Sequence, residues 1–292
     1  MAFLEYRPTE TLYQYSSVEG FKGIVASKAL WCSDLASAND PRELSLGFEH
    51  FVNALIQFRV AEYPDQLMGT NFLDTLAQFL IHYHRNQQTF CACFSPLKDS
   101  LPMWREYGAN YSGVSIGFRP TAITSMPGRI QKVKYLDPNT EEDFKRLVRD
   151  IAGSFDPQHS QNDANYWIVA GTSAFAAITA LKHNSWSYEQ EVRFIHAQVR
   201  QEQSAGTQIA EYSDEMPVFW SRPLSRVREN TNIEYKSFPF GRRQEGSSDH
   251  RKAIERIVLG PRCTLTEEQA RTLLQQNGYS DFSIEASDCQ IR

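Results

Sequence analysis

The sequence predicts an α+β fold: a single domain over residues 1–292, with a mixed or antiparallel central sheet and helical insertions at about 43–87 and 141–182. Short segments with alternating or wholly apolar residues, the patterns of strands, are dispersed along the whole chain. Over 43–61 and 65–85, apolar residues instead recur every three or four positions, which is the spacing of amphipathic helices. No internal repeat and no break in composition marks a domain boundary.

Each remaining element has its own local signal. Runs of β-branched and aromatic residues between turn-forming residues indicate strands, which we expect at residues 11–15, 29–33, 89–95, 114–118, 129–135, 188–195, 207–212, 233–238, 253–259 and 282–286. Capping residues followed by helical spacing predict further helices at residues 18–27, 100–107, 141–153, 163–181 and 266–276. The last of these starts with a capping box, because Thr266 stands three residues before Gln269.

The expected strand at residues 188–195 has an unusual charged face. Glu189, Glu191 and Arg193 alternate with mostly less polar residues, so their side chains would share one side of the sheet. Glutamate is depleted in strands, and a charged face therefore needs a reason. One reason is a solvated sheet face with ion pairs. The other is a functional site in which Arg193 orients Glu191.

The overall charge and the cysteines restrict the class of protein. With 30 basic and 35 acidic residues the net charge is −5, which does not favour nonspecific binding to nucleic acid. The five cysteines include no Cys-x-x-Cys spacing, and no signal peptide or membrane-spanning run is recognisable. We therefore expect a reduced, cytoplasmic protein without a bound metal or a membrane partner.

Several segments, in their order along the chain, resemble a widespread prokaryotic family catalogued as domain of unknown function 2971. The resemblance covers almost the whole chain and rests on Tyr13 to Tyr15, Leu30 to Ser33, Asn39 to Pro41, Cys93 to Ser95, Met103 to Tyr107, Gly113 to Phe118, Lys182, Trp186 to Arg193 and Ile257 to Pro261. The order of the segments is more specific than any one of them. The family name supplies no activity.

The order of these segments also resembles the three-part signature of ADP-ribosyltransferases, enzymes that use NAD as a substrate. That resemblance implies a nucleotide site with matching positions at Tyr13 or Tyr15, at Ser95 with Tyr107, and at Glu191. The chain departs from the signature on the first strand, where no His or Arg stands and the nearest basic residue is Arg7. The match of that strand to the family pattern is therefore incomplete.

In this interpretation the carboxylates do the chemistry. Glu191 stabilises the positive charge that develops on the ribose as nicotinamide leaves, and Glu189 is the general base for the acceptor. Trp104 and Tyr107 stack on a planar ring, although their helical spacing also fits two core anchors. The remaining nucleotide-binding candidates are Arg193, Asn39 and Lys182. Asn39 lies in a polar loop that also suits the start of a helix, and Lys182 suits contact with a phosphate or with the carboxyl end of a helix.

Two other function classes stay open. A metal-dependent nuclease would use Glu189 and Glu191 with Asp40 or Glu43 as further ligands, although an arginine stands at 193 where such sites have lysine. A non-catalytic module would bind a nucleotide or a protein in the aromatic pocket. For the transferase the partners are a nucleotide and a protein or nucleic-acid acceptor, and analogy suggests a bacterial toxin or defence component. The sequence gives no oligomeric state.

Overall fold

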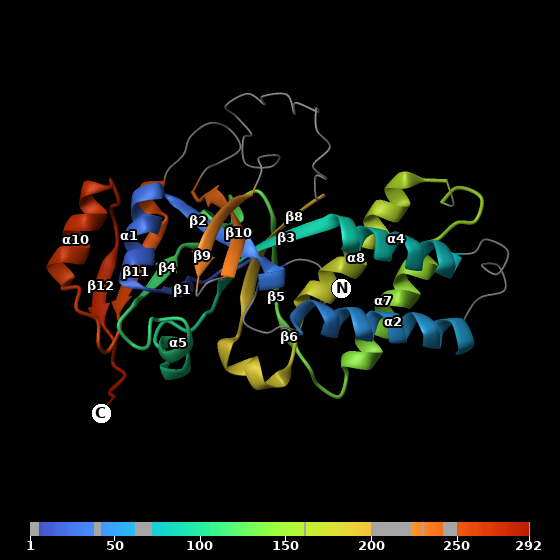
Figure 1. The fold of residues 1–292 in the computed structure, drawn as a ribbon, viewed down its shortest axis with the longest axis horizontal. Coiled ribbons are helices and arrows are strands. Elements are labelled where there is room, and N and C mark those ends of the chain that lie inside the picture. Colours follow the sequence, from blue (N-terminus) through green and yellow to red (C-terminus); the bar gives the residue numbers. More distant parts are fainter. Residues whose placement is uncertain are drawn as a thin grey trace, which may run out of the picture.

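The computed structural model describes residues 6–37, 42–61, 72–160, 162–199, 223–228, 231–241 and 250–291. It confirms the α+β class with mixed and antiparallel sheets. Figure 1 shows the sheets between two groups of helices. The group at one end contains α2 (Glu43–Ala61), α4 (Phe72–Asn86), α7 (Thr140–Gly153) and α8 (Ala164–Ala180). The group at the other end contains α1 (Val18–Ser27) and α10 (Glu267–Gln276).

The first sheet has four strands in the order β1 (Leu12–Ser16), β4 (Val114–Phe118), β11 (Ile254–Leu259) and β12 (Ser283–Ala286). Neighbours are antiparallel except β11 and β12, which are parallel. Because side chains alternate between the faces, Leu12 belongs to the main core while Tyr13 and Tyr15 belong to a separate aromatic cluster. That cluster includes Met103 and Trp104 of α5 (Leu101–Glu106).

The second sheet has six strands, all antiparallel to their neighbours. Their order is β5 (Arg129–Lys132), β8 (Val192–Val199), β3 (Gln87–Phe94), β2 (Ala29–Asp34), β10 (Thr231–Pro239) and β9 (Leu224–Arg228). A small parallel pair joins β6 (Lys134–Tyr135) to β7 (Leu181–Lys182). Apolar side chains of β2, β3, β8 and β10 pack with the first sheet in the main core.

The two sheets meet where β1 passes the end of β3. Tyr13 and Ser95 form an isolated antiparallel bridge with two backbone hydrogen bonds, N–H of Tyr13 to the Ser95 carbonyl at 2.7 Å and N–H of Ser95 to the Tyr13 carbonyl at 2.8 Å. This bridge places the first strand beside the carboxyl end of β3. Residues that are 82 positions apart in the sequence therefore share one corner of the fold.

The helices α2, α4, α7 and α8 enclose a second apolar core that includes Phe51, Phe72 and Phe144, each fully buried. Burial of such large side chains supplies most of the stabilisation of this part. At Gly47 the backbone of α2 approaches Ile178 of α8 so closely that a Cβ atom would collide with the Ile178 backbone. Glycine is therefore required at this helix crossing. Among the described helices, none is long and apolar enough to cross a membrane.

Some predicted boundaries were wrong. The segment 129–135 divides into β5 and β6, and the strand expected at 188–195 begins only at Val192. Three short 3-10 helices were not predicted: η1 (Leu35–Ser37), η2 (Asn184–Glu189) and η3 (His250–Lys252). The strand β9 was also not predicted. The strand predicted at 207–212 lies outside the described residues.

Candidate functional site

The local sequence between α8 and β8 builds a tight corner instead of a continuous strand. His183 caps η2, since its side chain accepts a hydrogen bond from the backbone N–H of Ser185. The 3-10 helix then ends at Gln190, whose φ of 47° and ψ of 45° are left-handed. Glu189 therefore does not lie on a strand, which corrects the predicted placement. The alternation of residues 188–191 resembled a strand, but capping and the left-handed residue determine the backbone.

Four charged side chains meet at this corner, and we call Lys182, Glu189, Glu191 and Arg193 the ion-pair cluster. Lys182 Nζ donates to Glu189 Oε2 at 2.6 Å and to Glu191 Oε2 at 3.1 Å. Arg193 binds Glu191 with two donors, Nε to Oε1 at 2.7 Å and Nη2 to Oε2 at 2.9 Å. Such a fork is the strong geometry for an arginine and a carboxylate. Arg193 thus orients Glu191, as the sequence predicts.

The ion-pair cluster is buried. Exposed fractions are 5% for Lys182, 2% for Glu189, 4% for Glu191 and 0% for Arg193, so the charged face is not solvated. Burial lowers the pKa of a lysine, but Glu191 and Glu189 raise the pKa of Lys182 overall. Burial raises the pKa of Glu191, and Lys182 opposes that shift. The two formal positive charges balance the two negative ones, which limits the cost of burying them.

Neighbouring polar groups hold the backbone at the end of η2 and the carboxylate of Glu189 in place. Ser95 Oγ donates to the Glu189 carbonyl at 2.6 Å, and the Glu191 N–H donates to Tyr135 Oη at 2.8 Å. The Tyr107 hydroxyl donates to Glu189 Oε1. Burial and the Glu189 charge raise the pKa of Tyr107, which keeps this donor protonated. Of the predicted residues, Tyr107 therefore contacts the Glu189 carboxylate, while Ser95 contacts the Glu189 backbone.

The predicted aromatic residues lie beside the ion-pair cluster and are largely enclosed. Trp104 is fully buried and packs edge-on against Tyr15 with ring centroids 4.7 Å apart. Its Nε1 donates to Asp99 Oδ1 at 2.5 Å, and the Tyr15 hydroxyl donates to the Leu97 carbonyl at 2.8 Å. Tyr13 is 7% exposed. Trp104 therefore packs as a core anchor, which its spacing also predicted, and has no exposed face on which a ring could stack.

The outer side of the ion-pair cluster is formed by residues that are partly buried or exposed. Trp186 covers Lys182, whose Nζ lies 4.9 Å from the ring centroid, and Tyr188 follows on the same 3-10 helix. Cys93 is exposed, and its thiol contacts both the Cys91 sulfur and the Glu191 carboxylate. Hydrogen bonding to Cys91, burial of the sulfur and the Glu191 charge raise the pKa of Cys93. These residues separate the cluster from solvent.

The sequence reasoning missed several members of this corner. Tyr135 and Thr179 touch the cluster from β6 and α8, since Arg193 Nη1 donates to the Thr179 carbonyl at 2.7 Å. No sequence pattern marks either residue. The position of Cys93 could have been inferred, because it stands two residues before Ser95 on the same strand. Asn39, the remaining predicted binding residue, lies outside the described residues, as does Asp40.

A metal site and a binding groove are the features that the nuclease and the binding module would require. Within the described ranges, no three His, Cys, Asp or Glu side chains form a group that could hold a metal ion.

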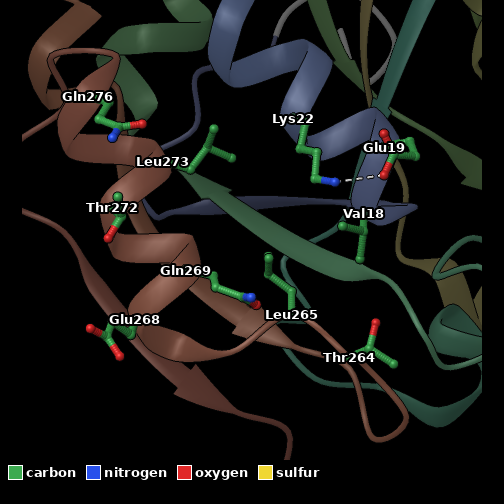
Figure 2. A pocket seen from close by; sticks show the side chains of 10 residues that line it. All are labelled: Val18, Glu19, Lys22, Thr264, Leu265, Glu268, Gln269, Thr272, Leu273 and Gln276. Carbon is green, nitrogen blue, oxygen red and sulfur yellow. Dashed lines mark hydrogen bonds and ion pairs between the residues drawn. The ribbon is translucent and has the colours of Figure 1, made fainter.

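A groove of about 730 Å³ lies between α1 and α10. Figure 2 shows Val18, Leu265 and Leu273 in its lining, with Lys22 and Glu19 paired at one side. None of the predicted site residues lines this groove.

A comparison with protein families gives a match. Residues 103–194 match a family model described as "Protein of unknown function (DUF2971)". The match covers less than half of the 292 residues but includes Tyr107 and the whole ion-pair cluster. It begins after β1 and β3 in the sequence, so Tyr13 and Ser95 lie outside it. No curated protein and no solved structure matches the chain.

Proposed function

We propose that the protein is an ADP-ribosyltransferase-like enzyme that acts on NAD at the ion-pair cluster. One observation carries the proposal: a single hydrogen-bonded corner joins Tyr13 on β1, Ser95 at the end of β3 and the carboxylates before β8. This is the order of positions in the three-part signature that the sequence resembles. The similarity to ADP-ribosyltransferases lies in the order of these residues and in their placement at one corner. No match to a solved structure supports it.

In this proposal Glu189 is the carboxylate that meets the substrate. A carboxylate can accept about four hydrogen bonds. Glu191 accepts three from Arg193 and Lys182 and also contacts the Cys93 thiol. Glu189 side-chain oxygens accept from Tyr107 and Lys182, which leaves capacity for a ribose hydroxyl. In this proposal Glu189, and not Glu191 as expected from the sequence, stabilises the reacting ribose, while Glu191 positions Lys182.

The proposed reaction is displacement at the ribose carbon that carries nicotinamide. Nicotinamide leaves with the bonding electrons of its bond to the ribose, positive charge develops on the ribose, and the acceptor nucleophile forms the new bond and releases its proton to solvent. A buried carboxylate stabilises such a charge better than an exposed one, because water does not screen it. Lys182 and Tyr107 hold the Glu189 side chain in one orientation, so little reorganisation is required during the reaction.

Substrate access requires a movement, because Glu189 is only 2% exposed. The half-buried side chains of Tyr107 and Trp186 cover the ion-pair cluster, and we propose that they rotate away when the nucleotide binds. The acceptor in this proposal is a protein or a nucleic acid in the cytoplasm. A role as a toxin or defence component rests on analogy with other transferases.

Nicotinamide release from NAD tests the proposal. The wild-type protein, supplied with protein and nucleic-acid acceptors, should release nicotinamide and attach ADP-ribose to an acceptor. Glu189→Gln keeps the size of the side chain but removes its charge, and should lower the rate at least about 100-fold, the usual effect of losing one transition-state contact. Glu285→Gln, at an exposed ion pair with Lys98, is the control and should retain the rate. Equal rates in Glu189→Gln and wild type would refute the assignment.

A second candidate is a non-catalytic binding module in which the ion-pair cluster only stabilises the corner. The observation that favours it is that all four carboxylate oxygens of the cluster already accept hydrogen bonds from protein groups. This candidate predicts no nicotinamide release by the wild type under any acceptor condition. It also predicts that Glu189→Gln changes the free energy of unfolding and no enzymatic rate.

A further inference from the structure

The second sheet carries an aromatic and basic platform on the outer face of β2, β10 and β9. Tyr235 pairs directly with Ser33 of β2, and Ile233 pairs with Arg226 of β9. Directly paired residues and residues two apart lie on the same face. The face therefore holds Trp31, Tyr235 and Arg226 together. We call these three residues the platform.

The geometry of the platform is that of a stacking surface. The Trp31 and Tyr235 rings are tilted by 32° with centroids 4.9 Å apart. The guanidinium carbon of Arg226 lies 5.6 Å from each centroid, and its Nη2 donates to Ser33 Oγ at 2.8 Å. Trp31 keeps 44% of its surface exposed. A tryptophan that served only as a core anchor would be buried, so part of the Trp31 side chain is open to contact by a ligand.

The same face of the sheet leads to the ion-pair cluster. Ser33 of β2 pairs with Cys91 of β3, and Cys93 of β3 pairs with Arg193 of β8. Trp31 and the cluster thus lie on the same side of the sheet, separated by two strand spacings, or about 10 Å. The exposed Cys93 lies between them by this register. A ligand of nucleotide size can therefore touch the platform and extend toward the cluster.

We propose that the platform binds the purine ring of a nucleotide by stacking on Trp31, with Arg226 beside its phosphate. Purine rings stack on tryptophan without needing a hydrogen-bond pattern, and a guanidinium is the preferred donor to phosphate. Leu224, which pairs with Tyr235 and is 52% exposed, extends the apolar surface beside the rings. Single-stranded nucleic acid could present the same ring, but a net charge of −5 disfavours a long polyanion.

Calorimetric titration with adenosine monophosphate tests the platform. The wild type should bind this nucleotide and should not bind ribose 5-phosphate, which lacks the ring. Trp31→Leu should weaken the affinity at least about fivefold, the lower end of the contribution of one base stacked on an aromatic ring, while Trp31→Phe should retain most of it. Arg226→Gln should weaken the affinity for adenosine monophosphate and leave the affinity for adenosine unchanged. Ile168→Ala, at another exposed apolar residue, is the control.

The results separate this inference from the transferase proposal. Since Trp31 is 44% exposed, Trp31→Leu should stay folded, and a cooperative thermal melt of the variant would show that a loss of affinity is local. Binding that depends on Trp31 without any nicotinamide release supports the platform and refutes the enzyme. Absence of adenosine monophosphate binding by the wild type, or a Trp31→Leu affinity equal to that of the wild type, overturns the platform even where NAD is cleaved. Preference for single-stranded nucleic acid over the mononucleotide overturns the assigned ligand.

Discussion

Replacement of Lys182 by methionine should destabilise the protein strongly. Lys182 is 5% exposed and bridges Glu189 and Glu191, at 2.6 and 3.1 Å. Methionine fills similar space but removes the charge, so two buried carboxylates face each other with Arg193 as the remaining cation. Breaking a buried ion pair by removing one partner costs about 3–5 kcal/mol, because the other charge stays uncompensated. The loss is a large share of a total stability of about 5–15 kcal/mol.

Urea unfolding followed by circular dichroism measures this effect. The matched control is Lys98→Met, which removes an ion pair of similar length, 2.9 Å to Glu285, but with side chains 42% and 37% exposed. Exposed pairs contribute about 0–1 kcal/mol. Without Lys182, burial holds the folded-state pKa of Glu191 further above its unfolded value. The deficit of Lys182→Met should therefore shrink as the pH falls toward 5. Equal losses in the two variants would refute the reasoning.

Four further predictions concern the ion-pair cluster and other parts of the fold. Combining Lys182→Met with Glu189→Gln should cost about 0.5–3 kcal/mol less than the sum of the single losses, as a double-mutant cycle in urea would show. Gly47→Ala should destabilise by about 1–3 kcal/mol through the clash in the helix crossing. Gly23→Ala, with open space around it, should instead stabilise by about 0.5–1 kcal/mol in thermal melts. Burial lowers the pKa of Lys236 from 10.5 to about 8, so this group makes stability rise with pH between those values, and Lys236→Met should remove that slope.

The fold was predictable where periodicity and capping are strong. The apolar spacing of α2 and α7 and the capping box at Thr266 have direct physical causes in the sequence, and the structure contains each of these helices. The pairing order of the strands was not predictable, because β8 pairs with β3 and β5, which are distant in the sequence. The 3-10 helix η2 was missed, since residues 188–191 alternate as a strand does.

The candidate site was predictable in residue type but not in arrangement. The pattern at 182–193 contains every member of the ion-pair cluster, and it predicted that Arg193 would orient Glu191. It could not show that the cluster is buried or that Lys182 joins both carboxylates, because burial depends on how η2 folds back beside Tyr107. The platform was missed, since Trp31 and Arg226 are brought together only by the pairing of β10 with β2 and β9.

The central claim is that a nucleotide reaches the carboxylate of residue 189. A crystal structure of Glu189→Gln with NAD tests it most directly, because the variant should bind the substrate without consuming it. We predict that a ribose hydroxyl lies within hydrogen-bond distance of the residue 189 side chain, with Tyr107 or Trp186 moved from its present position. NAD bound elsewhere, with the Tyr107 contact to residue 189 intact, would contradict the account.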